Sequence, residues 1–139
     1  MKNKTIIVCG GSGFIGSHLI DLLEKENPKN IINIDLSTGY DLLNAQSILR
    51  TFEKEKPDIV FNLAVLPLPL SLTEPVIVTI KIIQMMMPLL ELLRLGAYKR
   101  LVHISSSEAY GNAIGDCPQD ENHPLNPHTP YASAKACCD

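Results

Sequence analysis

The feature that most restricts the possible folds is a glycine-rich segment directly after an apolar run near the N-terminus. Residues 10–16 read Gly-Gly-Ser-Gly-Phe-Ile-Gly, and residues 5–9 before them read Thr-Ile-Ile-Val-Cys. Glycines permit a tight turn, a close approach of the backbone to a phosphate group, and close packing of a helix on a strand. The segment therefore predicts a strand, a turn and a helix whose N-terminus faces a pyrophosphate.

An acidic residue follows these glycines at the spacing of a dinucleotide site. Asp35 ends the next apolar run, about twenty residues beyond Gly16. A carboxylate at that place accepts hydrogen bonds from both hydroxyls of an adenosine ribose, and it repels the 2′-phosphate of NADP. No arginine adjoins Asp35 to bind such a phosphate. The two motifs predict NAD as the cofactor; the alternative for Asp35 is an aspartate that only caps a turn.

Four short runs rich in Ile, Val and Leu predict buried strands, and the stretches between them have helical patterns. The predicted strands cover residues 5–9, 31–35, 59–63 and 101–105, and the predicted helices cover about residues 14–26, 44–55 and 76–95, with a last helix from Tyr131. Apolar strands that alternate with helices are typical of a parallel sheet covered on both faces. We expect an α/β fold with a doubly wound, Rossmann-like parallel sheet, and one NAD-binding domain over residues 1–139.

Two parts of this pattern are shorter than in a complete fold of this kind. Few residues separate Asp35 from the helix after Asp41, so one crossover helix and one strand are expected to be missing or shrunken. The last helical pattern stops at Asp139, soon after Lys135. We expect a chain that is truncated within its last helix.

Composition and charge argue against several classes of function. The formal net charge is −3 and no cluster of Lys and Arg occurs, so no nucleic-acid partner is expected. The apolar stretch of residues 76–95 contains charged residues and a proline, so no membrane partner is expected. The cysteines lack the spacing of a zinc site or a disulfide framework, which predicts no metal and free thiols in the cytoplasm. They are Cys9, Cys117, Cys137 and Cys138.

A second group of polar residues follows the last predicted strand. Residues 105–111 read Ser-Ser-Ser-Glu-Ala-Tyr-Gly, at the carboxyl end of a strand, where open parallel sheets bind ligands. Farther along, Tyr131 and Lys135 stand four residues apart and share one face of a predicted helix. A lysine ammonium stabilises a nearby phenolate, which accepts a proton from a substrate hydroxyl. The alternative is an ordinary pair of residues on a helix surface.

Taken together, these residues resemble the extended short-chain dehydrogenases/reductases, the NAD-dependent epimerase/dehydratase family. The resemblance runs along nearly the whole chain, through residues 10–18, 35, 41–42, 57–58, 62–64, 71, 75, 99–102, 105–111, 121, 124 and 130–135. It implies an enzyme that transiently oxidises the C4 hydroxyl of a nucleotide-sugar with NAD, either as an epimerase, which is an isomerase, or as a dehydratase, which is a lyase.

The resemblance also implies roles for residues at matching positions. The implied cofactor-binding residues are Gly10, Gly13, Phe14, Ile15 and Gly16 at the pyrophosphate, Asp35 at the adenosine ribose, Asp41 and Leu42 at the adenine, and Ala64, Tyr131 and Lys135 farther along NAD. The implied catalytic residues are Ser106, which hydrogen-bonds the substrate hydroxyl, Tyr131 as acid/base, Lys135 beside it, and Glu108 next to the transient ketone. The alternative for Glu108 is an inert loop carboxylate.

The chain departs from the family pattern at a few places. Ser107 stands where the dTDP-glucose type of dehydratase carries an aspartate, which argues against that activity. Lys81 and Ile82 stand where the family usually has an asparagine near the nicotinamide. Relatives are longer and carry a C-terminal region that binds the nucleotide-sugar, which we expect to be absent here. Two alternatives therefore stay open: a non-catalytic dinucleotide-binding module, and an NADP-linked sugar reductase.

The helix of residues 76–95 has two possible roles. Its apolar residues predict either a core stripe or, as the family implies, a homodimer interface formed with the helix of residues 131–135. These residues are Met85, Met86, Met87, Leu89, Leu90 and Leu93. Pro88 is expected to kink or break this helix.

Overall fold

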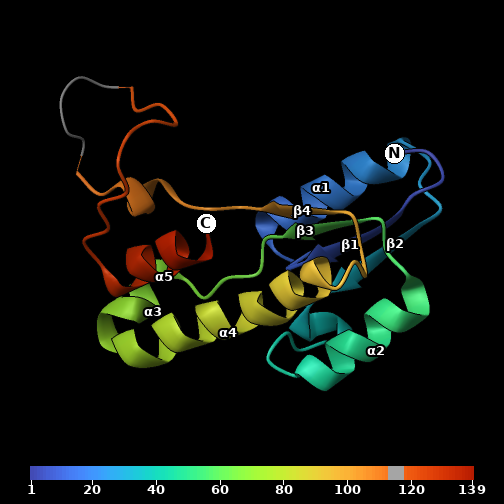
Figure 1. Cartoon of the computed structure of the whole chain (residues 1–139), viewed down its shortest axis with the longest axis horizontal. Helices are drawn as coiled ribbons and strands as arrows, with labels where there is room; N and C mark the ends of the chain where they lie inside the picture. Colours follow the sequence, from blue (N-terminus) through green and yellow to red (C-terminus); the bar gives the residue numbers. More distant parts are fainter. Residues whose placement is uncertain (113–117) are drawn as a thin grey trace. The chain divides into compact units, whose positions relative to one another are not determined.

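A computed structural model of the chain describes residues 1–112 and 118–139 (Figure 1). Cys117 lies outside the described residues, whereas Cys9, Cys137 and Cys138 are free thiols as predicted. All predicted strands and helices are present, and their bounds differ from the predicted ones by at most two residues. The elements are β1 (Thr5–Cys9), α1 (Phe14–Lys25), β2 (Asn30–Ile34), the 3-10 helix η1 (Leu36–Thr38), α2 (Ala45–Glu55), β3 (Ile59–Asn62), α3 (Leu68–Thr73), α4 (Pro75–Arg94), β4 (Arg100–His103), the 3-10 helix η2 (Ser107–Tyr110) and α5 (Pro130–Cys138).

The strands form one parallel sheet in the order β2-β1-β3-β4. The strand order reverses at β1, so the carboxyl ends of β1 and its neighbours form the place where doubly wound sheets bind ligands. Between β2 and α2 the described chain has only the short helix η1 and turns. This confirms the prediction that a crossover helix and a strand are missing from this half of the sheet.

The chain divides into two compact units, which we describe separately. The first unit comprises residues 1–65 and 85–104 and holds the whole sheet with α1, α2 and the second half of α4. The second comprises residues 66–84 and 105–139 and holds α3, the first half of α4, η2 and α5. The expectation of a single domain over residues 1–139 stays a prediction.

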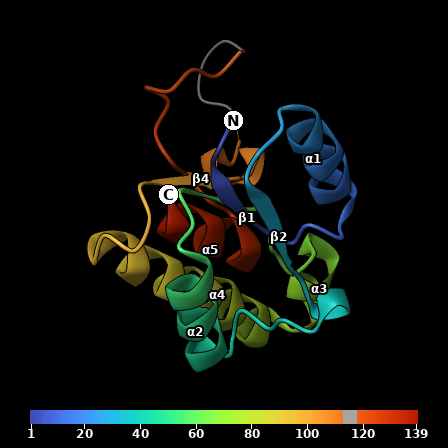
Figure 2. The same ribbon diagram turned by 90° about the vertical axis from the view of Figure 1, so that its right-hand side faces the viewer.

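In the first unit, β1 is buried over its full length because helices cover both faces of the sheet. Figures 1 and 2 show α1 on one side of the strands and α2 on the other. Ile6 and Val8 pack with Leu23 of α1 on one face. Ile7 and Cys9 point to the opposite face and belong to a cluster with residues of α2 and α4. That cluster includes Ile48, Phe52, Leu89 and Leu92.

Helix α3 was not predicted from the sequence. It is preceded by Pro67, its N-cap residue, and Pro69 lies in its first turn. Proline is tolerated there because the first N–H groups of a helix have no partner within the helix. The hydroxyl of Ser71 is buried and donates to the carbonyl oxygen of Leu68 at 2.7 Å.

Helix α4 continues through Pro88, so of the two expected effects, a kink or a break, the break is wrong. Proline removes one hydrogen bond inside a helix, and packing of the buried face offsets this loss. The core interpretation is confirmed for Met86 and Leu89, which are buried. Met85 and Leu93 pack against the core cluster that contains Leu89. Met87 and Leu90 are exposed.

By length and composition alone, α4 would be able to cross a membrane; its apolar window has a mean hydropathy of 1.9. The core helix of a soluble protein has the same properties, and α4 contributes Leu89 and Leu92 to the core of the first unit. The expectation that the chain has no membrane partner stays a prediction.

The three described thiols differ in exposure, which predicts different reactivity. Burial raises the pKa of Cys9 to about 12, whereas Cys137 is exposed. Because the thiolate is the reactive form, Cys9 is expected to be inert at pH 8. In a thiol titration of the native chain, Cys137→Ser should remove one fast-reacting equivalent and Cys9→Ser should remove none. A fast equivalent lost in Cys9→Ser would contradict the buried position of β1.

Candidate functional site

The turn after β1 brings the main chain against both neighbouring strands. The N–H of Gly10 donates to the carbonyl oxygen of Ile34 at 2.8 Å, and Gly10 has a positive φ of 75°. A side chain here would place its Cβ 2.8 Å from the main-chain nitrogen of Ala64. Glycine is therefore required at position 10 both by its backbone conformation and by the close approach of the chain after β3.

The other two glycines of the pattern have different roles. A Cβ on Gly16 would overlap the carbonyl oxygen of Gly10 and lie 2.6 Å from the Cα of Gly11, so Gly16 permits the packing of α1 on the turn. Gly13 has a φ of −74°, and a Cβ there would meet only the Gly10 oxygen, at 3.3 Å. The fold itself therefore requires Gly10 and Gly16, whereas Gly13 leaves open space at the surface of the turn.

The start of α1 is suited to an anion. Gly13 is the N-cap residue and provides no side-chain hydrogen bond. The N–H groups of the first turn lack partners within the helix and carry the positive end of its dipole. Phe14 and Ile15, the next residues, are 84% and 58% exposed, so their side chains flank this surface without belonging to the core.

At the end of β2, the Asp35 carboxylate accepts hydrogen bonds from two serines. Its Oδ1 accepts from the N–H and the hydroxyl of Ser37, at 3.0 and 2.8 Å, and its Oδ2 accepts from the N–H of Ser12 at 3.3 Å. Partial burial raises the pKa of Asp35, but hydrogen bonds from Ser37 and Ser12 outweigh it and leave the pKa below its usual value. Asp35 is therefore ionised at neutral pH, the form that accepts hydrogen bonds from a ribose.

The residues expected at the adenine and along the cofactor also lie in the first unit. The Asp41 carboxylate is exposed and accepts from the N–H of Leu43 at 2.8 Å. The Leu42 side chain is buried in the core, so only the main chain of Leu42 is available to a ligand. Ala64 lies beside Gly10 through its main chain.

These residues fit a dinucleotide. A carboxylate oxygen accepts about two hydrogen bonds, and the main-chain bond from Ser12 to Asp35 Oδ2 is long, at 3.3 Å. Gly13 leaves room for the pyrophosphate, and α1 presents its N–H groups there. Among residues 1–112 and 118–139, no group of three or more His, Cys, Asp and Glu side chains is placed to hold a metal ion.

In the second unit, Ser106 is held in a defined orientation. It is the N-cap residue of η2, and its Oγ accepts from the N–H of Glu108 at 3.2 Å. A hydroxyl that accepts a hydrogen bond can still donate its own proton, here to a substrate oxygen. The N–H of Asn126 donates to the carbonyl oxygen of Ala109 at 3.0 Å and ties η2 to the loop before α5.

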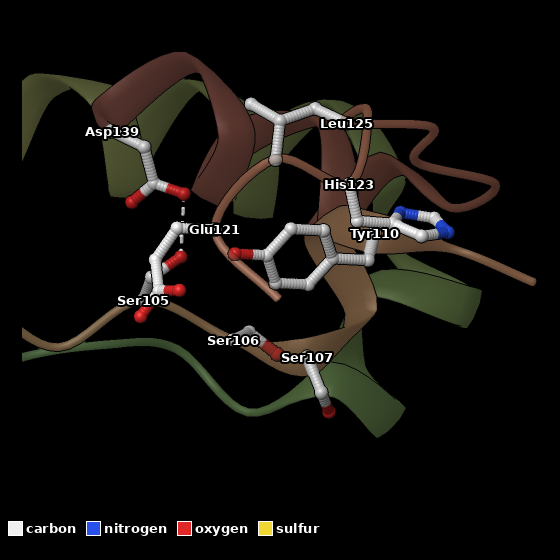
Figure 3. Close-up of a pocket in the computed structure, with 8 residues that line it drawn as sticks. All are labelled: Ser105, Ser106, Ser107, Tyr110, Glu121, His123, Leu125 and Asp139. Carbon is white, nitrogen blue, oxygen red and sulfur yellow. Dashed lines mark hydrogen bonds between the residues drawn. The ribbon is translucent and has the colours of Figure 1, made fainter. Parts of the chain in front are cut away.

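Ser106 lies at a cavity of about 500 Å³. Figure 3 shows the Ser105 hydroxyl directed at the Asp139 carboxylate, and the two oxygens are 2.5 Å apart. The rings of Tyr110 and His123 meet edge to face, with centroids 5.6 Å apart. The lining residues are Ser105, Ser106, Ser107, Tyr110, Glu121, His123, Leu125 and Asp139.

Helix α5 carries the tyrosine and the lysine. It begins with Thr129 as N-cap, whose hydroxyl oxygen accepts from the N–H of Ala132 at 3.0 Å. Tyr131 is half-buried and Lys135 is only 3% exposed. Burial lowers the pKa of Lys135 and outweighs the raising effect of the nearby Cys138 and Asp139, so the pKa lies below its usual value. Since Lys135 is buried, water screens its charge less than that of an exposed lysine.

The structure brings Ser106 to this cavity but does not place every expected catalytic residue in its lining. Glu108 is exposed and Tyr131 and Lys135 lie on α5; none of them lines the cavity. Sequence reasoning missed the contribution of Glu121 and His123, which come from a loop without a helix or strand pattern. Residue 121 belongs to the family resemblance, but no role at a cavity followed from it.

The different roles of two glycines can be tested by matched substitutions. We expect Gly10→Ala to lower the free energy of unfolding by about 2 kcal/mol or more, because of its positive φ and the contact with Ala64. Gly13→Ala should cost about 1 kcal/mol or less but weaken NAD binding about tenfold or more. Urea unfolding and calorimetry measure the two effects. Equal losses of stability in both variants would contradict the distinction.

Comparisons with known proteins agree with this geometry. The family model described as NAD dependent epimerase/dehydratase family matches residues 6–139. Human dTDP-D-glucose 4,6-dehydratase is 28% identical over 158 residues, which cover 98% of this chain and 45% of that protein. The chain spans about half the length of the curated relatives it matches.

Solved structures resemble the chain over nearly its whole length. UDP-glucose 4-epimerase from Thermotoga maritima, solved with UDP-glucose, has a TM-score of 0.87 and 27% identity, over 96% of this chain and 48% of that one. UDP-glucose 4-epimerase from Thermus thermophilus in complex with NAD has a TM-score of 0.83 and 28% identity, over 96% and 48%. The chain therefore belongs to the NAD dependent epimerase/dehydratase family, a family of NAD-dependent enzymes.

Proposed function

We propose that this chain is the NAD-binding part of a nucleotide-sugar epimerase or dehydratase that transiently oxidises the C4 hydroxyl of the sugar. The observation that carries the proposal is Ser106, whose hydroxyl is oriented by the N–H of Glu108 at a cavity large enough for a sugar. The same compact unit contains Tyr131 and Lys135. The names of the matched relatives support the class of substrate.

The residues of the first unit would hold the cofactor. The N-terminus of α1 and Gly13 would bind the pyrophosphate, Asp35 the adenosine ribose, and Asp41 with the main chain of Leu42 the adenine. When bound, NAD supplies the acceptor for the hydride of the sugar carbon and returns it later in the reaction.

The residues of the second unit would move the proton. Tyr131 in its phenolate form accepts the proton of the sugar hydroxyl, and the positive charge of Lys135 stabilises that form. Ser106 donates its hydroxyl proton to the same sugar oxygen and stabilises the charge that develops on it. The reverse transfers regenerate the hydroxyl after the hydride returns.

Epimerisation is favoured over dehydration by the position of Glu108. A dehydratase needs an acid or base next to the transient ketone, and Glu108 is exposed and outside the lining of the cavity. Ser107, where a dTDP-glucose type of dehydratase would carry aspartate, supports the same preference. A 4-epimerase needs neither acid.

The partner and location follow from the same proposal. We place the protein in the cytoplasm, where the thiols of Cys9, Cys137 and Cys138 stay reduced.

A homodimer through residues 76–95 and 131–135 is supported by apolar side chains of α4 that are exposed in the single chain. These are Val76, Ile80, Met87 and Leu90, whose intervals of four, seven and three residues place them on one face of the helix.

Cofactor choice tests the role of Asp35. Calorimetric titration should show binding of NAD about tenfold or more tighter than binding of NADP, because a carboxylate repels a 2′-phosphate. Asp35→Asn should reduce this ratio to about threefold or less. Since the pKa of Asp35 lies below its usual value, the preference should persist as the pH falls to about 5. A native chain that prefers NADP would favour the NADP-linked reductase.

Catalysis tests the role of Tyr131. With NAD and UDP-glucose or dTDP-glucose, we expect slow formation of reduced nicotinamide, measured by its absorbance, and a loss of about 100-fold or more in Tyr131→Phe. NAD affinity should change less than about threefold in this variant. Ser133→Ala, on the exposed side of α5, is the control and should retain the rate. Binding of NAD with no reduction in the native chain would favour the non-catalytic module.

A further inference from the structure

Strand β2 contains an amide that its surroundings satisfy only in part. Asn33 lies next to the last residue of β2, and its Nδ2 donates to the Oγ of Ser12 at 3.0 Å. Its Oδ1 is shielded from solvent and has no hydrogen-bond partner in the described structure. A buried polar atom without a partner is costly, and it persists where it serves another purpose.

Gly11 provides the space for this amide. A Cβ on Gly11 would overlap the Asn33 Oδ1 and lie 2.7 Å from its Cγ. Gly11 does not have a positive φ, so its backbone conformation does not require glycine. A Cβ there would also lie 2.8 Å from the Cδ1 of Ile20, so the absence of a side chain at position 11 makes room for both Asn33 and Ile20 beside the turn.

The hydrogen bond of the Asn33 amide is linked to those of Asp35 through two serine hydroxyls. The hydroxyl oxygens of Ser12 and Ser37 are 2.7 Å apart, and the Ser37 hydroxyl is also 2.8 Å from Asp35 Oδ1. Ser37 has one hydroxyl proton, and two acceptors lie within its reach. The N–H of Ser37 also donates to Oδ1, so this oxygen already has two donors while Ser37 points at it.

We propose that Asn33 is a positioning residue for the adenosine ribose, because it holds the Ser12 hydroxyl where it can take over the Ser37 proton. In the closed network Ser37 donates to Asp35 Oδ1. When a ribose hydroxyl donates to Oδ1, the Ser37 hydroxyl turns to Ser12, whose oxygen has one lone pair for Asn33 and one for Ser37. No donor loses its partner in this exchange, so the ribose is bound without the cost of a broken bond.

This exchange distinguishes a hydroxyl from other groups at the ribose. A 2′-hydroxyl donates a proton to Asp35, whereas a fully ionised 2′-phosphate has none to donate from that position. The inference rests on the proposed binding of NAD and adds Asn33, Ser12 and Ser37 to the residues that read the ribose. A purely structural role of Asn33 would affect all ligands of the turn equally.

The test compares NAD with analogues that lack the 2′- or the 3′-hydroxyl of the adenosine ribose. In the native chain, calorimetry should show that at least one analogue binds about tenfold more weakly than NAD. In Asn33→Ala, NAD should bind more weakly and this difference between NAD and the analogue should fall below about threefold. An unchanged difference would overturn the inference.

Three further variants make the test specific. Ser12→Ala removes the hydroxyl oxygen to which Asn33 donates and retains the N–H that binds Asp35. Because Ser12 is exposed, this variant carries the test if Asn33→Ala does not fold. The double variant of Asn33 and Ser12 should lose no more than either single one, because both remove one interaction. Asn30→Ala is the matched control, since the side-chain amide of this asparagine donates to Glu55 at 3.3 Å and Asn30 stands at the opposite end of β2 from Asp35. An equal effect in Asn30→Ala would also overturn the inference.

The failure of the inference differs from the failure of the proposed function. A native chain that binds neither NAD nor NADP would contradict both. The inference alone would be contradicted if the native chain prefers NAD to NADP and Asn33→Ala depends on the ribose hydroxyls as strongly as the native chain does.

Discussion

The main chain of Gly10 lies between the ends of two strands, and the cofactor-binding unit is arranged around that contact. On one side its N–H donates to Ile34 of β2, and on the other a Cβ would lie only 2.8 Å from the main-chain nitrogen of Ala64 after β3. A side chain of any size would force these segments apart. The contact therefore fixes where Asp35, the residue after Ile34, stands relative to the start of α1, and so where a ribose can lie relative to a pyrophosphate.

In the second unit, helix N-caps orient side chains. Ser106 and Thr129 are both N-cap residues, and each uses its side-chain oxygen to accept an N–H of the helix that follows. Such a cap fixes the rotamer of the capping side chain at little cost, because the N–H groups of the first turn need a partner in any case. At Ser106 the cap also directs a functional hydroxyl. Local helix geometry thus orients the hydroxyl without a separate supporting network.

The sequence predicted the sheet well because its signal is local. The runs that became β1 and β3 are almost wholly apolar, and the glycines at 10, 13 and 16 mark the turn without reference to any distant residue. Contacts between distant segments were not predictable in this way. Asn33 reads as one polar residue in an apolar strand, and only the fold shows that it lies beside Gly11. Likewise, α3 was missed because Pro67 and Pro69 are typical of a loop in the sequence, although proline is tolerated at the N-cap and in the first turn that they occupy.

Polar residues enter the sheet only near the carboxyl ends of its strands, apart from the exposed starts of β2 and β4 and Thr5 at the start of β1. Asn33 is next to last in β2, and Asn62 and His103, the last residues of β3 and β4, are paired in register. Asn62 is 2% exposed, its Nδ2 lies 3.2 Å from the Nδ1 of His103, and its Oδ1 has no partner in the described structure. A sheet selected for stability alone would continue its apolar runs to the end of each strand. Since polar groups replace apolar ones at the edge where such sheets bind ligands, stability is lost there in favour of recognition.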